Sequence, residues 1–198
     1  MKALCVLIAS AFLAICVASG SAFAAEKILY SFEDGVEGWE IPEWSLEKDD
    51  HVTQSIESSR DFSKDGRRSL EVKAAFPGKR WTAAIVEVAE YFDWSNNDVV
   101  SCDIYLPKDA PSGLKAKMIL TVGNEWKFTE MARSVKLVPG EWTTVAASLA
   151  DGSTDWRKVV ADQDFRGDIR KVDVRVESNK KPEFAGSFYI DSMKVTSK

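Results

Sequence analysis

The sequence predicts an all-β antiparallel sandwich of the jelly-roll type, and three observations predict it. Short segments of alternating apolar and polar residues recur along the chain, separated by Gly, Pro, Asn or Asp at intervals of about ten to fifteen residues. The sequence between consecutive segments shows no helical pattern, which argues against a parallel α/β sheet. Aromatic strands stand near both ends of the chain, at 27–33 and 186–196. We expect these two strands to pair and close the sandwich.

The first 24 residues have the pattern of an export signal rather than of a folded segment. Lys2 supplies a positive start, an apolar run follows, and Ala22-Phe23-Ala24 is a small-x-small cleavage sequence. Cleavage after Ala24 implies a secreted protein, either periplasmic or extracellular. Two alternatives are a membrane anchor and lipid attachment at Cys16. The first lacks a positively charged stop-transfer flank, and Ile15 is too large for the residue before a lipidated cysteine.

Residues 25–198 form a single domain by length. A chain of this size buries roughly 70% of the surface that its unfolded form exposes, so it needs no disulfides. Removing the signal deletes one lysine and no acid, which moves the formal net charge from -5 to -6. This acidic balance argues against nucleic-acid binding, which requires a basic face. Lys64, Arg67 and Arg68 cluster, but in a turn between expected strands.

Cys102 is the one cysteine outside the signal, so it has no partner for an intramolecular disulfide. It alternates with Val100 and Ile104 on the apolar side of an expected strand. We expect a small, buried, unreactive side chain, because no histidine or basic cluster adjoins it in the sequence to lower the pKa of its thiol.

Ten strands are expected, and Gly, Pro, Asn and Asp separate them along the chain. In chain order they are 27–33, 51–58, 68–75, 81–89, 98–106, 115–123, 132–138, 142–149, 168–178 and 186–196. Only 154–162 has a helical pattern, which predicts one short helical turn.

Alternation in three of these strands defines a possible binding surface. In 168–178, valines at every second position face one side while charged residues face the other, and 98–106 and 115–123 divide in the same way. If the three strands share a sheet, their outward residues form a polar floor that carries one aromatic ring. That floor would contain Asp103, Tyr105, Lys117, Arg175 and Glu177. Sugars need such hydrogen-bonding groups beside aromatic platforms, although an ordinary solvated sheet face has the same pattern.

Five short motifs, taken in order, extend this interpretation. They are Phe32-Glu33-Asp34-Gly35 with Gly38-Trp39 after it, Asp65-Gly66 before Ser69-Leu70, Ile104-Tyr105-Leu106-Pro107, Pro139-Gly140-Glu141-Trp142, and Phe188-Tyr189-Ile190-Asp191. In this order and spacing, the sequence resembles the jelly-roll carbohydrate-binding modules of the galactose-binding-domain-like superfamily, which accompany bacterial plant-polysaccharide hydrolases. The resemblance covers essentially the whole mature chain.

The resemblance implies a structural calcium ion where the first strand, an early turn and the last strand meet. Calcium binds six to eight oxygen ligands, which include carboxylates and backbone carbonyls. Glu33 and Asp191 match the carboxylate positions, and the turn that contains Lys64 and Arg67 matches the source of carbonyls. The alternative is that both acids accept hydrogen bonds from turn amides or pair with the nearby arginines.

The resemblance also sorts the seven tryptophans. It implies packing roles for Trp39 and Trp142, and the sequence around Trp94 and Trp156 indicates structural roles for these two. Trp44, Trp81 and Trp126 remain. Trp81 and Trp126 flank strands that the family uses for its concave face, so we expect them to stack on sugar rings, unless both prove buried.

Taken together, the sequence predicts a secreted, non-catalytic carbohydrate-binding module for a plant-type polysaccharide, with β-glucan or mannan first. Trp81 and Trp126 would stack, while Asp103, Tyr105, Lys117, Arg175 and Glu177 would bind hydroxyls. The resemblance implies a glycoside hydrolase acting on the same polymer as a partner, and no membrane span is expected in the mature chain.

Two other classes of function remain open. One is a glycoside hydrolase or polysaccharide lyase, which needs two suitably placed carboxylates. Many acids could supply them, namely Glu87, Asp103, Glu125, Glu130, Asp173 and Glu177, but no spacing selects a pair. His51, the only histidine, lies in an expected strand without a catalytic motif. The other class is a structural or adhesion sandwich of the cell envelope.

Overall fold

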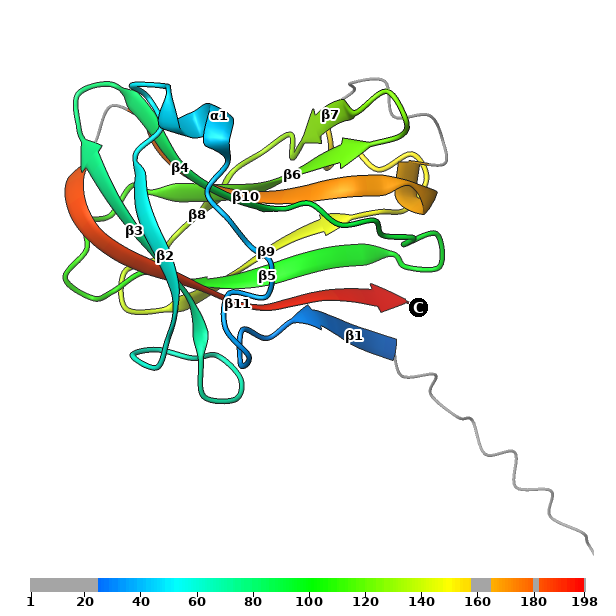
Figure 1. Cartoon of the computed structure of the whole chain (residues 1–198), viewed down its shortest axis with the longest axis horizontal. Helices are drawn as coiled ribbons and strands as arrows, with labels where there is room; N and C mark the ends of the chain where they lie inside the picture. Colours follow the sequence, from blue (N-terminus) through cyan, green and yellow to red (C-terminus); the bar gives the residue numbers. More distant parts are fainter. Residues whose placement is uncertain (1–24, 158–164, 180–181, 198) are drawn as a thin grey trace, which may run out of the picture.

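Two antiparallel β-sheets pack face to face in a sandwich (Figure 1). This computed structural model describes residues 25–157, 165–179 and 182–197, and the expected export signal at 1–24 lies outside them. Within the described part of the chain, no helix is long and apolar enough to cross a membrane.

The first sheet, here called sheet A, has six strands. In spatial order these are β2 (Thr53–Ser59), β3 (Ser69–Pro77), β11 (Glu183–Ser197), β5 (Val99–Tyr105) and β9 (Trp142–Ser148), with β1 (Ala25–Tyr30) also paired to β11. The second, sheet B, has five strands. They are β4 (Trp81–Val88), β10 (Ile169–Asn179), β6 (Lys115–Val122) and β7 (Lys127–Glu130), with β8 (Val135–Lys136) also paired to β6.

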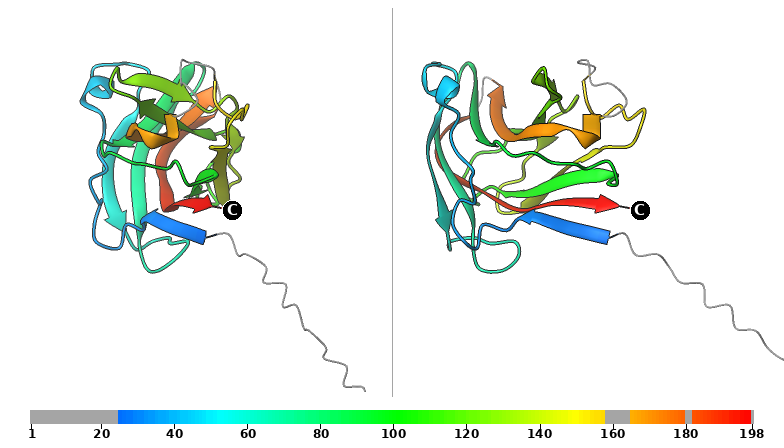
Figure 2. Two further views of the ribbon diagram at one scale, coloured as in Figure 1. Left: turned by 90° about the vertical axis from the view of Figure 1, so that its right-hand side faces the viewer. Right: turned by 45° about the vertical axis from the view of Figure 1, so that its right-hand side comes forward.

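The pairing of the two chain ends is confirmed. β1 runs antiparallel to the last residues of β11, with Ala25 opposite Ser197, and the turned views show the two strands side by side (Figure 2). β11 pairs with β3 as far as Ile190 and with β1 from Met193 onward. The register shifts between these two partners, where Ser192 has a φ of 50°. The long strand β11 therefore pairs with β3 over its first part and with β1 over its last part.

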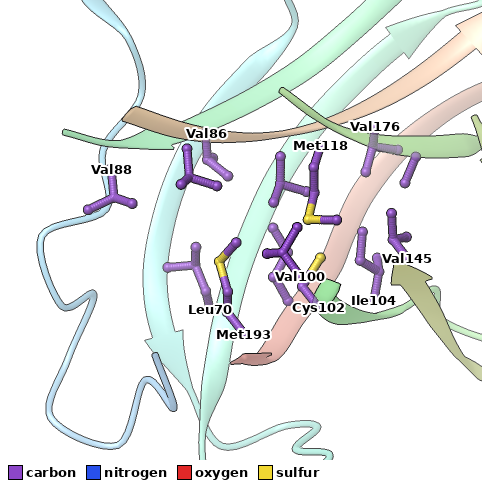
Figure 3. Packing of buried hydrophobic residues seen from close by; sticks show 14 of the residues in the cluster. Leu70, Val86, Val88, Val100, Cys102, Ile104, Met118, Val145, Val176 and Met193 are labelled. Atoms are coloured by element: carbon purple, nitrogen blue, oxygen red, sulfur yellow. The ribbon is translucent and has the colours of Figure 1, made fainter. Parts of the chain in front are cut away.

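The core fills the space between the sheets with the apolar half of each alternating strand. Val174 and Val176 of β10 and Met118 of β6 meet Ile104 and Val145 from sheet A, as Figure 3 shows in part. Cys102 belongs to this cluster, is fully buried and is a free thiol, and its burial raises the pKa of the thiol. The expectation of a buried cysteine is confirmed. Trp39 and Trp94 are buried as well.

Two local predictions differ from the structure. The strand expected at 132–138 reduces to Val135–Lys136, and β7 at Lys127–Glu130 was not predicted because it is only four residues long. The helical turn expected at 154–162 is wrong for its described part: Trp156 forms a bridge with Met131, and residues 158–164 lie outside the description. Among the residues that the structure describes, the helical segments are α1 (Glu43–Leu46) and a 3₁₀ turn, η1 (Phe165–Gly167).

Candidate functional site

A groove of about 370 Å³ lies on the outward face of sheet B. Its floor consists of outward residues of β4, β10 and β6, and α1 and β7 stand on either side (Figure 1). Trp44 from α1 and Phe128 from β7 line the two sides, and both rings are exposed, at 43% and 48%. Two exposed rings beside a polar floor form an arrangement that can hold a flat, hydroxyl-bearing ligand.

His51 connects the tryptophans on one side of the groove. It forms a bridge with Ala83 of β4, which places its ring edge-on to Trp44 at 5.0 Å and to Trp81 at 6.2 Å between centroids. Its Nδ1 lies 2.8 Å from a carboxylate oxygen of Asp50. The histidine side chain is therefore fixed by both rings and by an acid, which makes it a wall residue of the groove.

The floor carries a buried acid pair. Glu87 of β4 and Asp173 of β10 are opposite each other in the antiparallel register, and both are 5% exposed or less. Lys171 donates a hydrogen bond to Glu87 Oε1 at 2.5 Å. Burial, followed by the charge and hydrogen bond of Glu87, raises the pKa of Asp173 to about 8. Burial beside Glu87 therefore favours the protonated form of the Asp173 carboxyl group.

Arg175 is the centre of an ionic network at the other end of the floor. Its guanidinium donates to Glu130 at 2.7 Å, lies 3.4 Å from Glu177 and sits over the Trp81 ring at 5.7 Å. Glu130 also faces Lys117 at 3.5 Å. This network holds the floor residues in place and leaves Trp81 partly buried.

Some of the predicted sugar-binding residues come together here. Trp81 and Arg175 line the groove, and Lys117 and Glu177 join Arg175 through Glu130 or directly. Trp126 lies in the turn between β6 and β7, is 58% exposed, and is not among the residues that line the groove. Neither Trp81 nor Trp126 is buried.

Asp103 and Tyr105 are placed differently from the prediction. Their strand, β5, belongs to sheet A, so they lie on the opposite outer face from the groove. Asp103 accepts a hydrogen bond from Thr144 at 2.5 Å, and Tyr105 stacks on Phe62 at 4.4 Å between centroids. The assumption that the three alternating strands share one sheet is therefore wrong, because alternation defines the face of a strand but not its sheet.

Of the thirteen described residues that line the groove, eleven were not predicted as site residues. Among these eleven are Trp44, His51, Glu87, Phe128 and Asp173. Glu87 and Asp173 were among the acids considered for catalysis, but only the cross-strand register brings them together. Trp44 lies in a polar stretch of the sequence, and only the structure shows that the short helix α1 places it at the groove.

The two acids predicted to bind calcium lie at the turn expected for them. Glu33 Oε1 accepts hydrogen bonds from the backbone N–H groups of Arg67 and Arg68 at 2.6 and 2.9 Å. Asp191 Oδ2 accepts from Lys64 N–H and Asp65 N–H at 2.7 and 3.2 Å.

The turn thus presents donors to both carboxylates, whereas calcium requires oxygen ligands. Within the described residues, no group of three acids, histidines or cysteines is arranged to hold a metal. This arrangement does not fit a calcium cage, and calcium stays a prediction.

The sequence matches, over residues 30–192, the family described as mannanase, galactose-binding domain-like. This match confirms the resemblance that the motifs indicated. No curated protein matches the sequence.

Three solved structures are similar in fold. One is Caldicellulosiruptor saccharolyticus CBM27-1 in complex with mannohexaose, with a TM-score of 0.60 and 18% identity over 86% of this chain and 96% of that one. The second is CBM28, a module specific for non-crystalline cellulose, with a TM-score of 0.62 and 16% identity over 85% and 93%. The third is a family 11 module from Clostridium thermocellum in complex with a β-1,3-1,4-mixed-linked tetrasaccharide, with a TM-score of 0.57 and 18% identity over 89% and 98%.

Proposed function

The chain belongs to the mannanase, galactose-binding domain-like family, and from this premise we propose that it is a secreted, non-catalytic carbohydrate-binding module. Its ligand is a β-linked plant polysaccharide, a mannan or a β-glucan, bound along the groove of sheet B. The observation that carries the proposal is the position of Trp44 and Phe128, two exposed rings on opposite sides of a polar floor.

The groove supplies both kinds of contact that a sugar needs. Pyranose rings have apolar faces that stack on aromatic side chains, and each such contact contributes about 1 kcal/mol. The floor supplies carboxyl, ammonium and guanidinium groups for hydroxyls, from Glu87, Lys171, Asp173 and Arg175. A few stacked rings with several hydrogen bonds correspond to roughly micromolar to millimolar affinity.

The similar structures support a neutral plant glycan. The ligand of CBM27-1 in its complex is mannohexaose, and that of the family 11 module is a β-1,3-1,4-mixed-linked tetrasaccharide. Because the sequence identities are below 20%, these similarities support the fold alone, and a mannan or β-glucan ligand for this chain is a proposal.

Affinity electrophoresis in gels that contain mannan, β-glucan, xylan or galactan tests this proposal. We expect retardation by mannan or β-glucan, and Trp44→Ala should reduce it. Tyr105→Phe, on the opposite sheet, serves as the matched control. If none of the four polymers retards the wild-type protein, the proposal fails.

Hydrolysis is disfavoured by the geometry of the acid pair. Glycoside hydrolases hold their two carboxyl groups about 5 Å apart or more, so that an anomeric carbon or a water fits between them. Glu87 and Asp173 instead face each other across paired strands, and both are almost fully buried in the floor. An assay for reducing sugars and for unsaturated products on the retarding polymer should stay at background. A structural or adhesion role would be favoured by burial of Trp81 and Trp126, and neither side chain is buried.

Three finer expectations belong to the proposal. Mass spectrometry of the exported protein should find an N-terminus at Ala25. A glycoside hydrolase that acts on the bound polymer is the partner we propose, and co-sedimentation on that polymer tests it.

Calcium would require the turn near Gly66 to direct carbonyls toward Glu33 and Asp191. A rise in Tm on adding CaCl₂, reversed by EDTA, would support that site, and an unchanged Tm would remove it.

A further inference from the structure

The acid pair on the groove floor has an unusual combination of burial and missing partners. Glu87 and Asp173 are 4% and 5% exposed, and both line the groove. Glu87 Oε2 is buried, and no ionised or polar group among the described residues donates to it. A buried acceptor without a donor costs about 1–3 kcal/mol, and Asp173, which faces Glu87 across the strands, can supply that donor only when its carboxyl group is protonated.

The backbone around Glu87 fixes the pair in place. The N–H and C=O groups of Glu87 exchange hydrogen bonds with Glu40, at 2.9 and 2.8 Å, and β10 pairs on the other side. The two side chains therefore cannot separate by moving their strands. Two ionised carboxylates that face each other in a buried floor repel each other, and one shared proton relieves the repulsion.

The charged groups around the pair limit how it can be neutralised. Lys171 of β10 is already bonded to Glu87 Oε1, and Arg175 of β10 is engaged by Glu130. Across the groove, His51 is paired with Asp50, and Lys48 lies over the Trp44 ring at 5.0 Å.

From the remaining elements, β6 contributes Ile119 and Thr121 to the groove, and β7 contributes Phe128, none of which is charged. Glu40 meets Glu87 through the backbone. A proton is therefore the simplest source of neutrality for the second acid of the pair.

We propose that Glu87 and Asp173 share one proton and act together as the hydroxyl-binding point of the groove, so that glycan binding depends on that proton. This inference rests on the proposed function. With the proton present, Asp173 donates to Glu87, and the remaining lone pairs of the two carboxyl groups accept a sugar hydroxyl. Without it, two adjacent carboxylates repel and attract water and counterions, which a bound sugar would have to displace.

The raised pKa of Asp173, at about 8, sets the pH range of the effect. Below that value the proton is bound, and binding is at full strength. Above that pH the free protein loses the proton, and the protein must take up a proton from solvent when it binds the ligand. The affinity therefore falls by up to tenfold for each further pH unit.

Isothermal titration calorimetry of the full chain with mannohexaose and cellohexaose, between pH 6 and pH 9.5, tests this inference. We expect affinity to fall more than about tenfold between pH 7.5 and pH 9.5. Above pH 8, titrations in two buffers of different ionisation enthalpy should show uptake of close to one proton per ligand. Tm measured at each pH confirms that the protein remains folded.

Two variants separate the pair from other sources of pH dependence. Asp173→Asn keeps a donor but cannot ionise, so its affinity should be independent of pH over this range. Asp103→Asn is the matched control, because Asp103 is equally buried but lies on sheet A. It should keep the wild-type pH profile. If Asp173→Asn does not fold, Glu87→Gln replaces it with the same expectation.

The outcomes distinguish this inference from the proposed function. Binding with a flat pH profile and no proton uptake overturns the shared proton and leaves the module intact. No binding of either hexasaccharide at any pH, together with no retardation by any polymer, overturns both. A carboxyl carbon signal that titrates near pH 8 in the free wild type, and is missing in Asp173→Asn, supports the pair independently of ligand.

Discussion

The Arg175 guanidinium lies over the ring of Trp81, 5.7 Å from its centroid. Glu130 and Glu177 pair with the same guanidinium, at 2.7 and 3.4 Å, and so hold it in place beside the ring. Trp81 therefore lines the groove beside His51 with its side chain partly buried, while Trp44 is the more exposed platform.

Replacing each tryptophan by alanine should reduce glycan affinity most for the rings that line the groove. We expect Trp44→Ala and Trp81→Ala each to weaken binding of the retarding glycan by about fivefold or more, since a stacked ring contributes about 1 kcal/mol. Trp126→Ala should change affinity less than twofold, because Trp126 does not line the groove. Calorimetry on the three variants measures this. A larger loss for Trp126→Ala than for Trp44→Ala would restore Trp126 as a platform.

Residues on the outer face of sheet A should not affect affinity. Tyr105→Phe keeps the stacking on Phe62 and removes only a hydroxyl on the face away from the groove. Its dissociation constant for the same glycan should equal that of the wild type within about twofold, with an unchanged Tm. A clear loss of affinity would mean that the glycan binds on sheet A.

Gly66 should be intolerant of a side chain for two reasons. Its φ is +67°, and a Cβ there would lie 2.3 Å from Glu33 Oε1. Gly66→Ala should lose roughly 1–2 kcal/mol from the backbone alone, and more from displacing the carboxylate, which together lower Tm by several degrees. Gly123→Ala is the matched control, because its φ is +71° and the space around it is open. Equal losses in thermal unfolding would show that the Glu33 contact is unimportant.

The stability of the fold should decline in mild alkali through Asp173. Its pKa is raised in the folded state, from 3.8 to about 8, so the stabilising contribution of its neutral form is full below pH 4 and lost as pH rises through 8. Between pH 6 and pH 9 the wild type should lose on the order of 2 kcal/mol relative to Asp173→Asn. Chemical denaturation at both pH values measures the difference, and parallel losses would contradict the raised pKa.

Cys102 should remain silent toward thiol reagents while the protein is folded. It is fully buried, and burial raises the pKa of its thiol, so little thiolate forms. Ellman's reagent should find less than about a tenth of a thiol per chain in buffer and close to one in denaturant. Rapid reaction of the native protein would place Cys102 at the surface.

The fold was predictable from local patterns, and the groove only in part. Alternation such as that of Val172, Val174 and Val176 defines a half-buried strand without further information. It does not say which sheet the strand joins, and for this reason Asp103 was assigned to the wrong face. Partner choice depends on long-range pairing, and so does the meeting of Glu87 with Asp173, which are 86 positions apart in the sequence.

The walls of the groove were harder still to predict. Trp44 is carried by a four-residue helix and Phe128 by a four-residue strand, and elements this short have almost no period for a pattern to show. The turn acids gave a different result. Their location near Gly66 followed from the motifs, but whether they face amides or a metal depends on the orientation of single peptide groups.

The pairing of β1 with the end of β11 has a practical consequence for how the molecule can be attached to a surface. Ala25 and Ser197 are neighbours in sheet A, whereas the groove opens on the outward face of sheet B. A linker, dye or resin joined near either of these residues would hold the molecule by the same corner. Both orientations would leave the groove directed away from the support, so an immobilised array could be built from either end.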